Sequence, residues 1–241
     1  FKIMPTHDVD NPFLNNVISN EAELLRRLIG DLVKRKNLSL FYRSFMCWLN
    51  YQVTGKKRSP NDPIDTFDKL MTLSEESGLK NYFYFMTNKE NVNELSGRYG
   101  IDDHDILKLI SEIWERGHEI GFHPTGDSNS NERSFSEQAK RLMEVGREIG
   151  FVPKGGRQHY LLWSLDKTQQ FWEQNEFRYD STLGYGEYAG FRCGTCKEYS
   201  LWNNQTNSSM KLKERPLILM ESSLLGREMN LSGESVLLTI D

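Results

Sequence analysis

The sequence predicts an α/β fold in which a parallel sheet carries helices on its outside. Helical patterns alternate with short apolar strand patterns along the chain, and this order is typical of parallel sheets. Side chains able to bind a metal follow two of the strand patterns, and a segment with an arginine follows the glycine pair Gly155 and Gly156. In a closed β/α barrel, the edge where strands end is the usual face for an active site.

The predicted helices have apolar residues on one side or recognisable ends. Asn20 is the expected N-cap of the first helix, and Gly78, Gly117 and Gly150 are expected to follow the ends of three others. The second helical segment is apolar nearly all round, which predicts a buried helix or part of a lid. The six segments are 20–36, 41–53, 65–77, 102–116, 134–149 and 166–175.

The predicted strands are short and apolar. Residues 1–4 form an apolar run that should deliver the acids after it to the end of a strand. Residues 81–86, with four consecutive aromatic residues, predict a strand buried on both faces. Residues 118–122 and 177–180 predict two further strands.

Composition excludes several classes of function. The chain has 241 residues, 27% of them charged, and a formal net charge of -4, so no basic footprint for nucleic acid is present. No run approaches the ~18 apolar residues of a membrane span. We expect a single domain over residues 1–241, cut from a longer chain. No signal peptide opens the chain, which slightly favours the cytoplasm, although the cut end weakens this expectation.

The three cysteines do not predict a disulfide framework or a zinc site. Cys193 and Cys196 form a C-x-x-C pattern, but no second pair of ligands follows at the spacing of a zinc finger. Neighbouring glycines indicate a loop rather than the strand–helix context of a redox motif. We therefore expect two loop thiols that pack or incidentally pair.

The segment 6–10, Thr-His-Asp-Val-Asp, holds the first candidate site residues. Side chains alternate along a strand, so Asp8 and Asp10 are expected to share one face. Two carboxylates close together repel each other unless a cation or a shared proton lies between them. The segment therefore predicts a metal ion or a shared proton at this position.

The second candidate segment contains His118, His123 and Asp127. On one strand His118 and His123 face opposite sides, so both cannot bind one metal ion unless the strand is bulged. His123 lies beyond the last apolar residue and close to Asp127, which makes it the better ligand. His118 is expected to be buried and hydrogen-bonded.

Asp10, His123 and Asp127 would give a mixed nitrogen and oxygen ligand set from two loops. This set suits Zn²⁺ or another divalent first-row ion, with Co, Ni and Mn as alternatives. Such an ion polarises a carbonyl and lowers the pKa of bound water toward ~7. Asp8 could accept the proton of that water, and Arg157 beside it would keep Asp8 ionised. Arg157 taken alone could equally be a surface charge.

These segments resemble the polysaccharide deacetylase (NodB-homology) family, carbohydrate esterase family four. Residues 6–10 are similar to the family's first motif, with a base followed by a metal-binding aspartate, here Asp8 and Asp10. The Gly-His-Glu-Ile-Gly stretch at 117–121 precedes the metal histidine of its second motif, here His123. Its third motif begins with the arginine that orients the base, here Arg157. Residues 177–185 resemble the Tyr-Asp-Ser-Ser stretch of one branch.

The resemblance covers residues 1–221. It implies a distorted (β/α) barrel, incomplete at the C-terminus, and metal-dependent hydrolysis of a non-peptide C–N bond. The implied substrate is a carbohydrate, through N-deacetylation of a polysaccharide that contains amino sugars. Twelve per cent of the residues are aromatic, which slightly favours a sugar substrate because aromatic faces stack on sugars.

The sequence departs from the family at three positions. Val9 stands between the two acids, which leaves open which one is the base. Asp127 falls where the family has its second histidine, and no histidine follows His159 to serve as the family's late general acid. The last residues, 236–241, indicate the start of another element, so truncation explains the missing histidine best. Two alternatives remain: a catalytically impaired barrel that binds a glycan or a metal, and an allantoinase-like amidase acting on a small amide.

Overall fold

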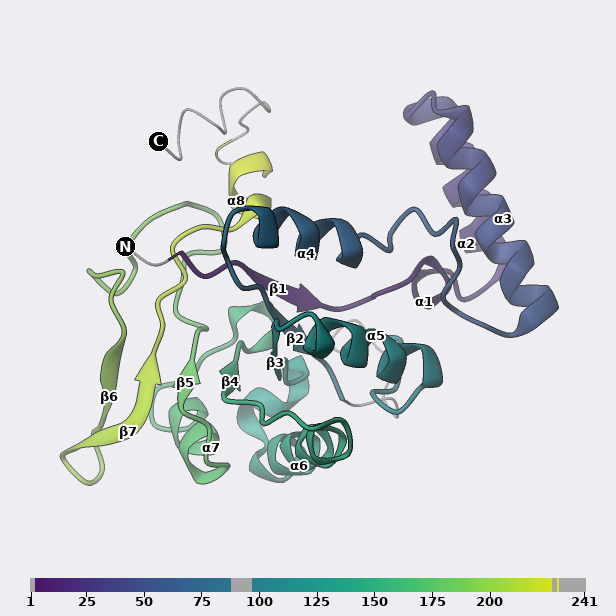
Figure 1. The fold of residues 1–241 in the computed structure, drawn as a ribbon. Coiled ribbons are helices and arrows are strands. Elements are labelled where there is room, and N and C mark those ends of the chain that lie inside the picture. Colours follow the sequence, from purple (N-terminus) through teal and green to yellow (C-terminus); the bar gives the residue numbers. More distant parts are fainter. Residues whose placement is uncertain (1–2, 88–96, 227–228, 230–241) are drawn as a thin grey trace. The chain divides into compact units, whose positions relative to one another are not determined.

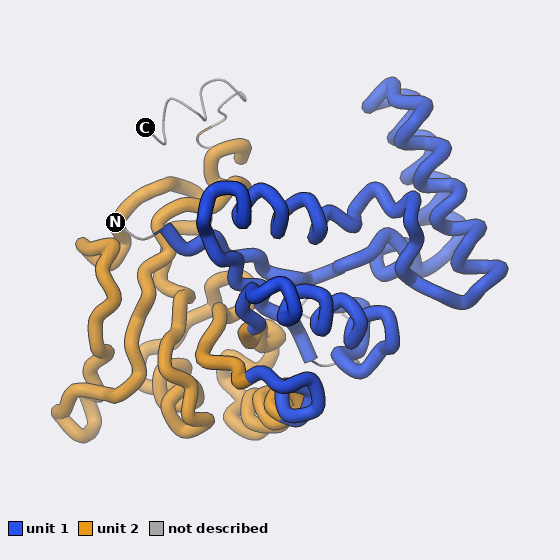
Figure 2. The backbone as a smooth tube through the Cα atoms, in the orientation of Figure 1, with its two compact units in different colours: residues 1–120, 144–151 blue, residues 121–143, 152–241 orange. Residues whose placement is uncertain are grey.

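The computed structural model describes residues 3–87, 97–226 and 229, and the expected element at 236–241 lies outside them. The chain divides into two compact units (Figure 2). Unit 1 comprises residues 1–120 and 144–151, and unit 2 comprises residues 121–143 and 152–241. None of the described helices is long and apolar enough to cross a membrane.

The described strands form a seven-stranded sheet in the order β1-β2-β3-β4-β5-β7-β6, and Figure 1 labels them. Strand β1 pairs with β2, β3 with β4, β4 with β5 and β5 with β7 in parallel, and β6 pairs with β7 in antiparallel orientation. The mixed α/β class is thus confirmed. The order is linear within the described residues, so closure of a barrel stays a prediction. The strands are β1 Thr6–Val9, β2 Tyr82–Phe85, β3 Glu119–Phe122, β4 Gly155–Gly156, β5 Tyr179–Asp180, β6 Tyr199–Asn203 and β7 Ser208–Glu214.

The helices follow the predicted segments closely. Asn20 caps α2 as expected, because its side chain accepts a hydrogen bond from the Glu23 backbone N–H at 3.0 Å. Gly78, Gly117 and Gly150 follow α4, α5 and α6 with positive φ angles, the conformation that glycine adopts without strain. The α-helices are α1 Leu14–Val17, α2 Glu21–Ile29, α3 Leu38–Thr54, α4 Phe67–Glu76, α5 His104–Glu115, α6 Glu132–Ile149, α7 Thr168–Gln174 and α8 Glu221–Leu225. The other helical segments are the π-helical η1 Gly30–Lys34 and the 3-10 segments η2 Gly126–Ser130 and η3 His159–Leu161.

Two predicted segments differ from the observed ones. The first strand begins at Thr6, so Asp8 lies inside β1 and not after a strand at residues 1–4. Helix α3 was expected to be buried or part of a lid; only Ser44 and Cys47 of its residues are buried, so the first alternative is wrong and the second stays a prediction. The pattern was apolar all round, whereas packing against α1 and α2 covers only part of the helix.

Each unit has its own apolar core. In unit 1 the strand β2 is covered as expected, with Phe83, Tyr84 and Phe85 fully buried. In unit 2 the core is a cluster of aromatic rings in contact with one another. Its members are Phe122, Phe135, Phe171, Trp172 and Phe177. Phe122 ends β3, so this cluster fixes the strand that leads into His123.

The glycine pair of β4 allows three strands of unit 2 to approach closely. A Cβ atom on Gly156 would overlap the carbonyl oxygen of Phe122 on β3, and one on Gly155 would overlap the carbonyl oxygen of Tyr179 on β5. The backbone pairs in register there, Phe122 with Gly156 and Gly155 with Tyr179. The close backbone approach inferred from the glycine pair is therefore present.

We predict that Gly156→Ala lowers the free energy of unfolding by about 1–3 kcal/mol or more, because backbone atoms cannot yield to the added methyl group. Chemical denaturation measures this. Gly186→Ala is the matched control, since its Cβ would have only Leu161 within reach, at 3.9 Å. Equal stability of the two variants would contradict the close-approach explanation.

Candidate metal centre

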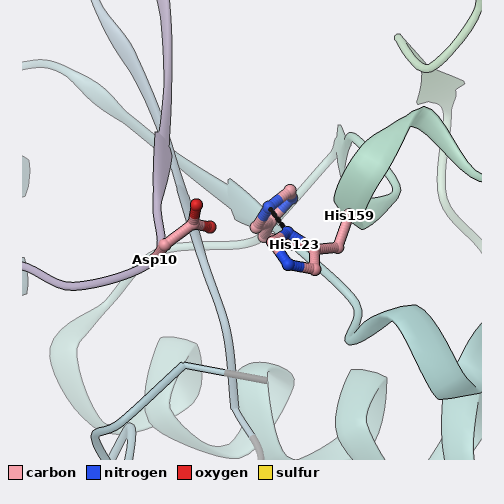
Figure 3. Close-up of side chains that lie close together, drawn as sticks. All are labelled: Asp10, His123 and His159. Carbon is pink, nitrogen blue, oxygen red and sulfur yellow. Dashed lines mark hydrogen bonds between the residues drawn. The ribbon is translucent and has the colours of Figure 1, made fainter. Parts of the chain in front are cut away.

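Two histidines of unit 2 lie in contact (Figure 3). The Nε2 atom of His123 lies 3.1 Å from the Nδ1 atom of His159, within hydrogen-bonding distance. His123 is 1% exposed and His159 is 7% exposed. His123 directly follows β3, and His159 begins η3 shortly after β4. The site residue that sequence analysis missed is therefore His159.

Backbone hydrogen bonds hold the two histidine loops together. Arg157 N–H donates to the carbonyl of Phe122 at 3.0 Å, and His159 N–H donates to the carbonyl of Pro124 at 3.3 Å. The chain then turns through two non-glycine residues with positive φ, Tyr160 at 55° and Leu161 at 53°. Such angles carry strain and are concentrated at functional sites. The ring of Tyr160 lies against that of His159, with centroids 4.0 Å apart.

The hydrogen bonds of His123 indicate which of its nitrogens could bind a metal ion. Nδ1 lies 2.6 Å from the carbonyl oxygen of Arg157. A carbonyl only accepts, so Nδ1 carries the proton and Nε2 keeps its lone pair. Metal-binding histidines usually donate their other N–H in this way. Two nitrogens each about 2.1 Å from one ion lie about 3.0–3.4 Å apart at ligand angles of ~90–109°, and the observed 3.1 Å fits this range.

Asp8 and Asp10, the expected acids, belong to unit 1 and are half-buried. Asp8 pairs with Tyr84 in the register of β1 and β2. Tyr99 fixes the backbone of Val9, the residue before Asp10. The Tyr99 hydroxyl donates a hydrogen bond to the Val9 carbonyl at 2.6 Å and accepts one from the Met86 N–H at 2.8 Å. Burial, with the nearby charge of Asp10, raises the pKa of Tyr99 well above its ordinary value, so the hydroxyl stays a donor.

The other expected ligand, Asp127, lies in η2 and accepts a hydrogen bond from the Thr125 hydroxyl at 2.5 Å. The histidine that contacts His123 is His159, two residues beyond Arg157. That spacing after a strand is the signal that could have identified His159, because alternate residues share a face. The role of Asp127 as a ligand stays a prediction.

His118 was expected to be structural, and its surroundings in unit 1 agree. It is buried, and its Nδ1 accepts a hydrogen bond from the Asn81 backbone N–H at 3.1 Å. Its Nε2 lies 3.2 Å from a carboxylate oxygen of Glu75. Burial lowers the pKa of His118 although Glu75 opposes the shift, so the ring is predominantly neutral near pH 7. Both ring nitrogens are occupied by these partners.

Arg157 is buried in unit 2 beside two carboxyl groups. It is 4% exposed, and its Nε donates to the carbonyl of Ser181 at 3.0 Å. Asp180 on β5 and Glu214 on β7 are both fully buried, and they are paired in the register of these two strands. Arg157 favours the charged form of both acids. The surface-charge alternative for Arg157 is therefore wrong.

The surroundings favour a proton on this acid pair. Burial raises the pKa of Glu214 to about 9, and the charge of Asp180 adds to the effect. Burial likewise raises the pKa of Asp180 to about 7, while the Thr182 hydroxyl and backbone N–H and the Arg157 charge oppose the rise. Burial and mutual repulsion thus favour a proton on this pair at neutral pH, so that Arg157 does not face two ionised carboxylates. The other groups that face Glu214 are Arg192, Cys193 and Tyr199.

This protonation predicts a specific pH dependence of stability. The folded protein holds a proton on Glu214 that the unfolded chain releases near pH 4.5. The resulting stabilisation is complete below that pH and is lost as pH rises through about 9. Glu214→Gln removes the dependence, since an amide does not titrate. Between pH 6 and 9 the wild type should lose free energy of unfolding relative to the variant, by at most about 1.4 kcal/mol per pH unit.

Urea denaturation across this pH range measures the difference. Glu137→Gln, at an exposed glutamate of unit 2 that pairs with Arg133, is the control and should keep the wild-type slope. If Glu214→Gln shows the same slope as the wild type, Glu214 is ionised in the folded protein.

No family model and no curated protein match the chain. Polysaccharide deacetylases are among the solved structures that are similar to it. A "putative polysaccharide deacetylase" from Mycobacterium smegmatis is 18% identical with a TM-score of 0.49, over 89% of this chain and 58% of that one. The 4-alpha-glucanotransferase of Thermococcus litoralis is 15% identical with a TM-score of 0.47, and the match covers 72% of this chain and 27% of that one. The deacetylase PplD of Streptococcus pyogenes is 10% identical with a TM-score of 0.42, and the match covers 99% of this chain and 96% of that one.

Proposed function

We propose that the chain is a metal-dependent hydrolase of a non-peptide C–N bond, acting as an N-deacetylase on a polysaccharide that contains amino sugars. The observation that carries the proposal is the buried pair of His123 and His159, in which Nε2 of His123 and Nδ1 of His159 lie 3.1 Å apart while Nδ1 of His123 contacts a backbone carbonyl. The resemblance of residues 6–10, 117–123 and 157 to polysaccharide deacetylase motifs supports the same class of reaction.

The ligands in this proposal are His123 and His159 of unit 2, together with Asp10, which the resemblance of residues 6–10 to the family's first motif supplies. Two neutral imidazoles and one carboxylate suit Zn²⁺, and such a set leaves a position open for water or substrate. His159 then takes the place of the second family histidine, which the sequence alone had assigned to Asp127. When bound, the ion would polarise the amide carbonyl and make water a stronger nucleophile near neutral pH.

The remaining chemistry falls to Asp8 and Arg157. Asp8 accepts a proton from the attacking water as the general base. Arg157 orients Asp8 in this proposal, as the arginine of the family's third motif orients the base. Arg157 can do this because its guanidinium is fixed by Ser181 and balanced by the acid pair of Asp180 and Glu214.

A second candidate is a metal- or glycan-binding protein without turnover. It is motivated by the absence of any histidine after His159, where the resembling family has its general acid. The two candidates differ in one measurement, release of acetate from an oligomer of N-acetylated amino sugars. Turnover that Asp8→Asn abolishes would exclude the binding protein.

The ligand set predicts which variants lose the metal. His123→Ala and His159→Ala should each weaken zinc binding by more than the roughly 10–100-fold that loss of an outer partner of a ligand causes. Asp127→Ala should keep the metal, and so should His104→Ala, at an exposed histidine. Mass spectrometry of the metal content, with calorimetric zinc titration, measures this. If Asp127→Ala empties the site while His159→Ala does not, the ligand set deduced from the sequence alone is correct.

The role of Arg157 predicts a loss of activity that leaves the metal in place. Arg157→Met should lower kcat/KM with the metal content unchanged, because Asp8 loses the group that orients it while the metal ligands remain. Arg157→Lys, which keeps the charge but not the planar guanidinium, should lose less activity, and denaturation of both variants checks that the chain still folds. Asp10→Ala should lose metal and activity together. If Arg157→Met instead strips the metal, the roles of Asp8 and Asp10 are to be exchanged.

A further inference from the structure

Helices α2 and α3, joined through η1, form a helical hairpin in unit 1 (Figure 1). Its two arms meet at Asp31, which is fully buried and accepts a hydrogen bond from the Ser44 hydroxyl at 2.9 Å. Arg27 and Arg35 form ion pairs with the same carboxylate, at 3.3 and 2.8 Å. The hydrogen bond from Ser44 identifies the side of each arm that faces the other.

Both arms of the hairpin also expose large apolar side chains. On α3 they form one stripe at helical spacing, with Leu38 at 75% and Val53 at 78% exposed at its two ends. Tyr42, Phe45 and Leu49 lie between them. On the first arm the exposed apolar residues are Leu25, Ile29, Leu32 and Val33. A monomer rarely leaves so many large apolar side chains exposed in one place, and such patches mark interaction sites.

Helix geometry places the two stripes on the same side of the hairpin. At 100° per residue, Leu25 and Ile29 lie about 120–160° around the helix from Asp31. Leu38, Tyr42, Phe45 and Leu49 lie about 100–160° around α3 from Ser44 in the same rotational sense. The arms run in opposite directions along the hairpin, and equal rotations of antiparallel helices point to the same side. Both stripes therefore point away from the contact between the arms and lean toward the same side of the hairpin, and we call the residues of the two stripes the hairpin face.

The charge of this region is opposite to that of the whole chain. The hairpin, residues 21–54, contains six lysines and arginines and three acidic residues, a net charge of +3, whereas the whole chain has -4. Among the described residues, Arg26, Lys34, Lys36 and Lys56 form no ion pair, so their charges are available to a partner. A second copy of the chain would bring another positive hairpin against this one, which argues against self-association.

We propose that the hairpin face docks on the surface of a bilayer that contains anionic phospholipids. Apolar and aromatic side chains on one face with basic residues around them are the features by which amphipathic helices lie in a membrane interface. The anionic headgroups complement the positive charge of the hairpin. The proposal is independent of the proposed deacetylase activity, because no candidate site residue belongs to the hairpin.

Vesicle binding tests this proposal. The protein should co-sediment with vesicles of phosphatidylcholine plus phosphatidylglycerol, and bind much less to phosphatidylcholine alone. Binding should weaken in ~1 M salt, where charges are screened beyond about 3 Å. Leu25→Ser with Phe45→Ser should lower the partition coefficient by at least about tenfold, since two buried anchors are lost. Leu73→Ser, at an exposed leucine of α4 outside the hairpin face, is the matched control and should bind like the wild type.

A second measurement reports where the hairpin face lies. Phe45→Trp should be quenched by lipids brominated on their acyl chains only if this side chain enters the bilayer. Equal binding of the wild type and the Leu25→Ser, Phe45→Ser variant, or no quenching, overturns the proposal. Light scattering of the protein without vesicles tests whether the hairpin face instead binds a second copy of the chain. A wild-type dimer that this variant converts to a monomer would identify the face as a contact between copies and would also overturn the proposal.

Discussion

The close approach of backbones at the glycine pair of β4 is the constraint on which unit 2 depends. Gly155 and Gly156 leave room for β3 and β5 on either side. Because β3 lies so near, the carbonyl of Arg157 reaches His123 and the loop after β4 brings His159 beside it. Any side chain at Gly156 would separate the two histidine loops. The lack of room for a side chain at Gly155 and Gly156 thus determines the geometry of the candidate metal centre.

Strands β5 and β7, which follow β4 in the sheet order, set the electrostatics behind that centre. Arg157 could not remain buried without a nearby negative charge, and two ionised carboxylates could not remain buried together. One proton on the acid pair resolves both demands, leaving Arg157 with approximately one negative partner. The positions of Asp180 and Glu214 in the register of β5 and β7 therefore matter as much as their charges.

Much of the fold could be predicted because the relevant signals are local. The glycines after three helices, the cap at Asn20 and the aromatic strand β2 each depend on a few neighbouring residues. The burial of α3 could not be predicted, since the pattern of a helix does not say how much of its surface other elements cover. The hairpin of β6 and β7 was missed although the alternating burial of β7 has a period of two. For the candidate site, His123 and Arg157 were predicted from their motifs, whereas the contact of His159 with His123 joins two loops that are far apart in the sequence.

The outermost strand of the sheet order is β6, and its pairing with β7 shifts register between Ser200 and Trp202. A regular edge strand offers a ladder of unsatisfied N–H and C=O groups on which another chain can grow by strand addition. A register irregularity interrupts that ladder and increases the local twist. Although Trp202 is largely exposed there, β6 is a poor template for a growing aggregate. We therefore expect the irregularity to disfavour the addition of a strand from another chain at this edge.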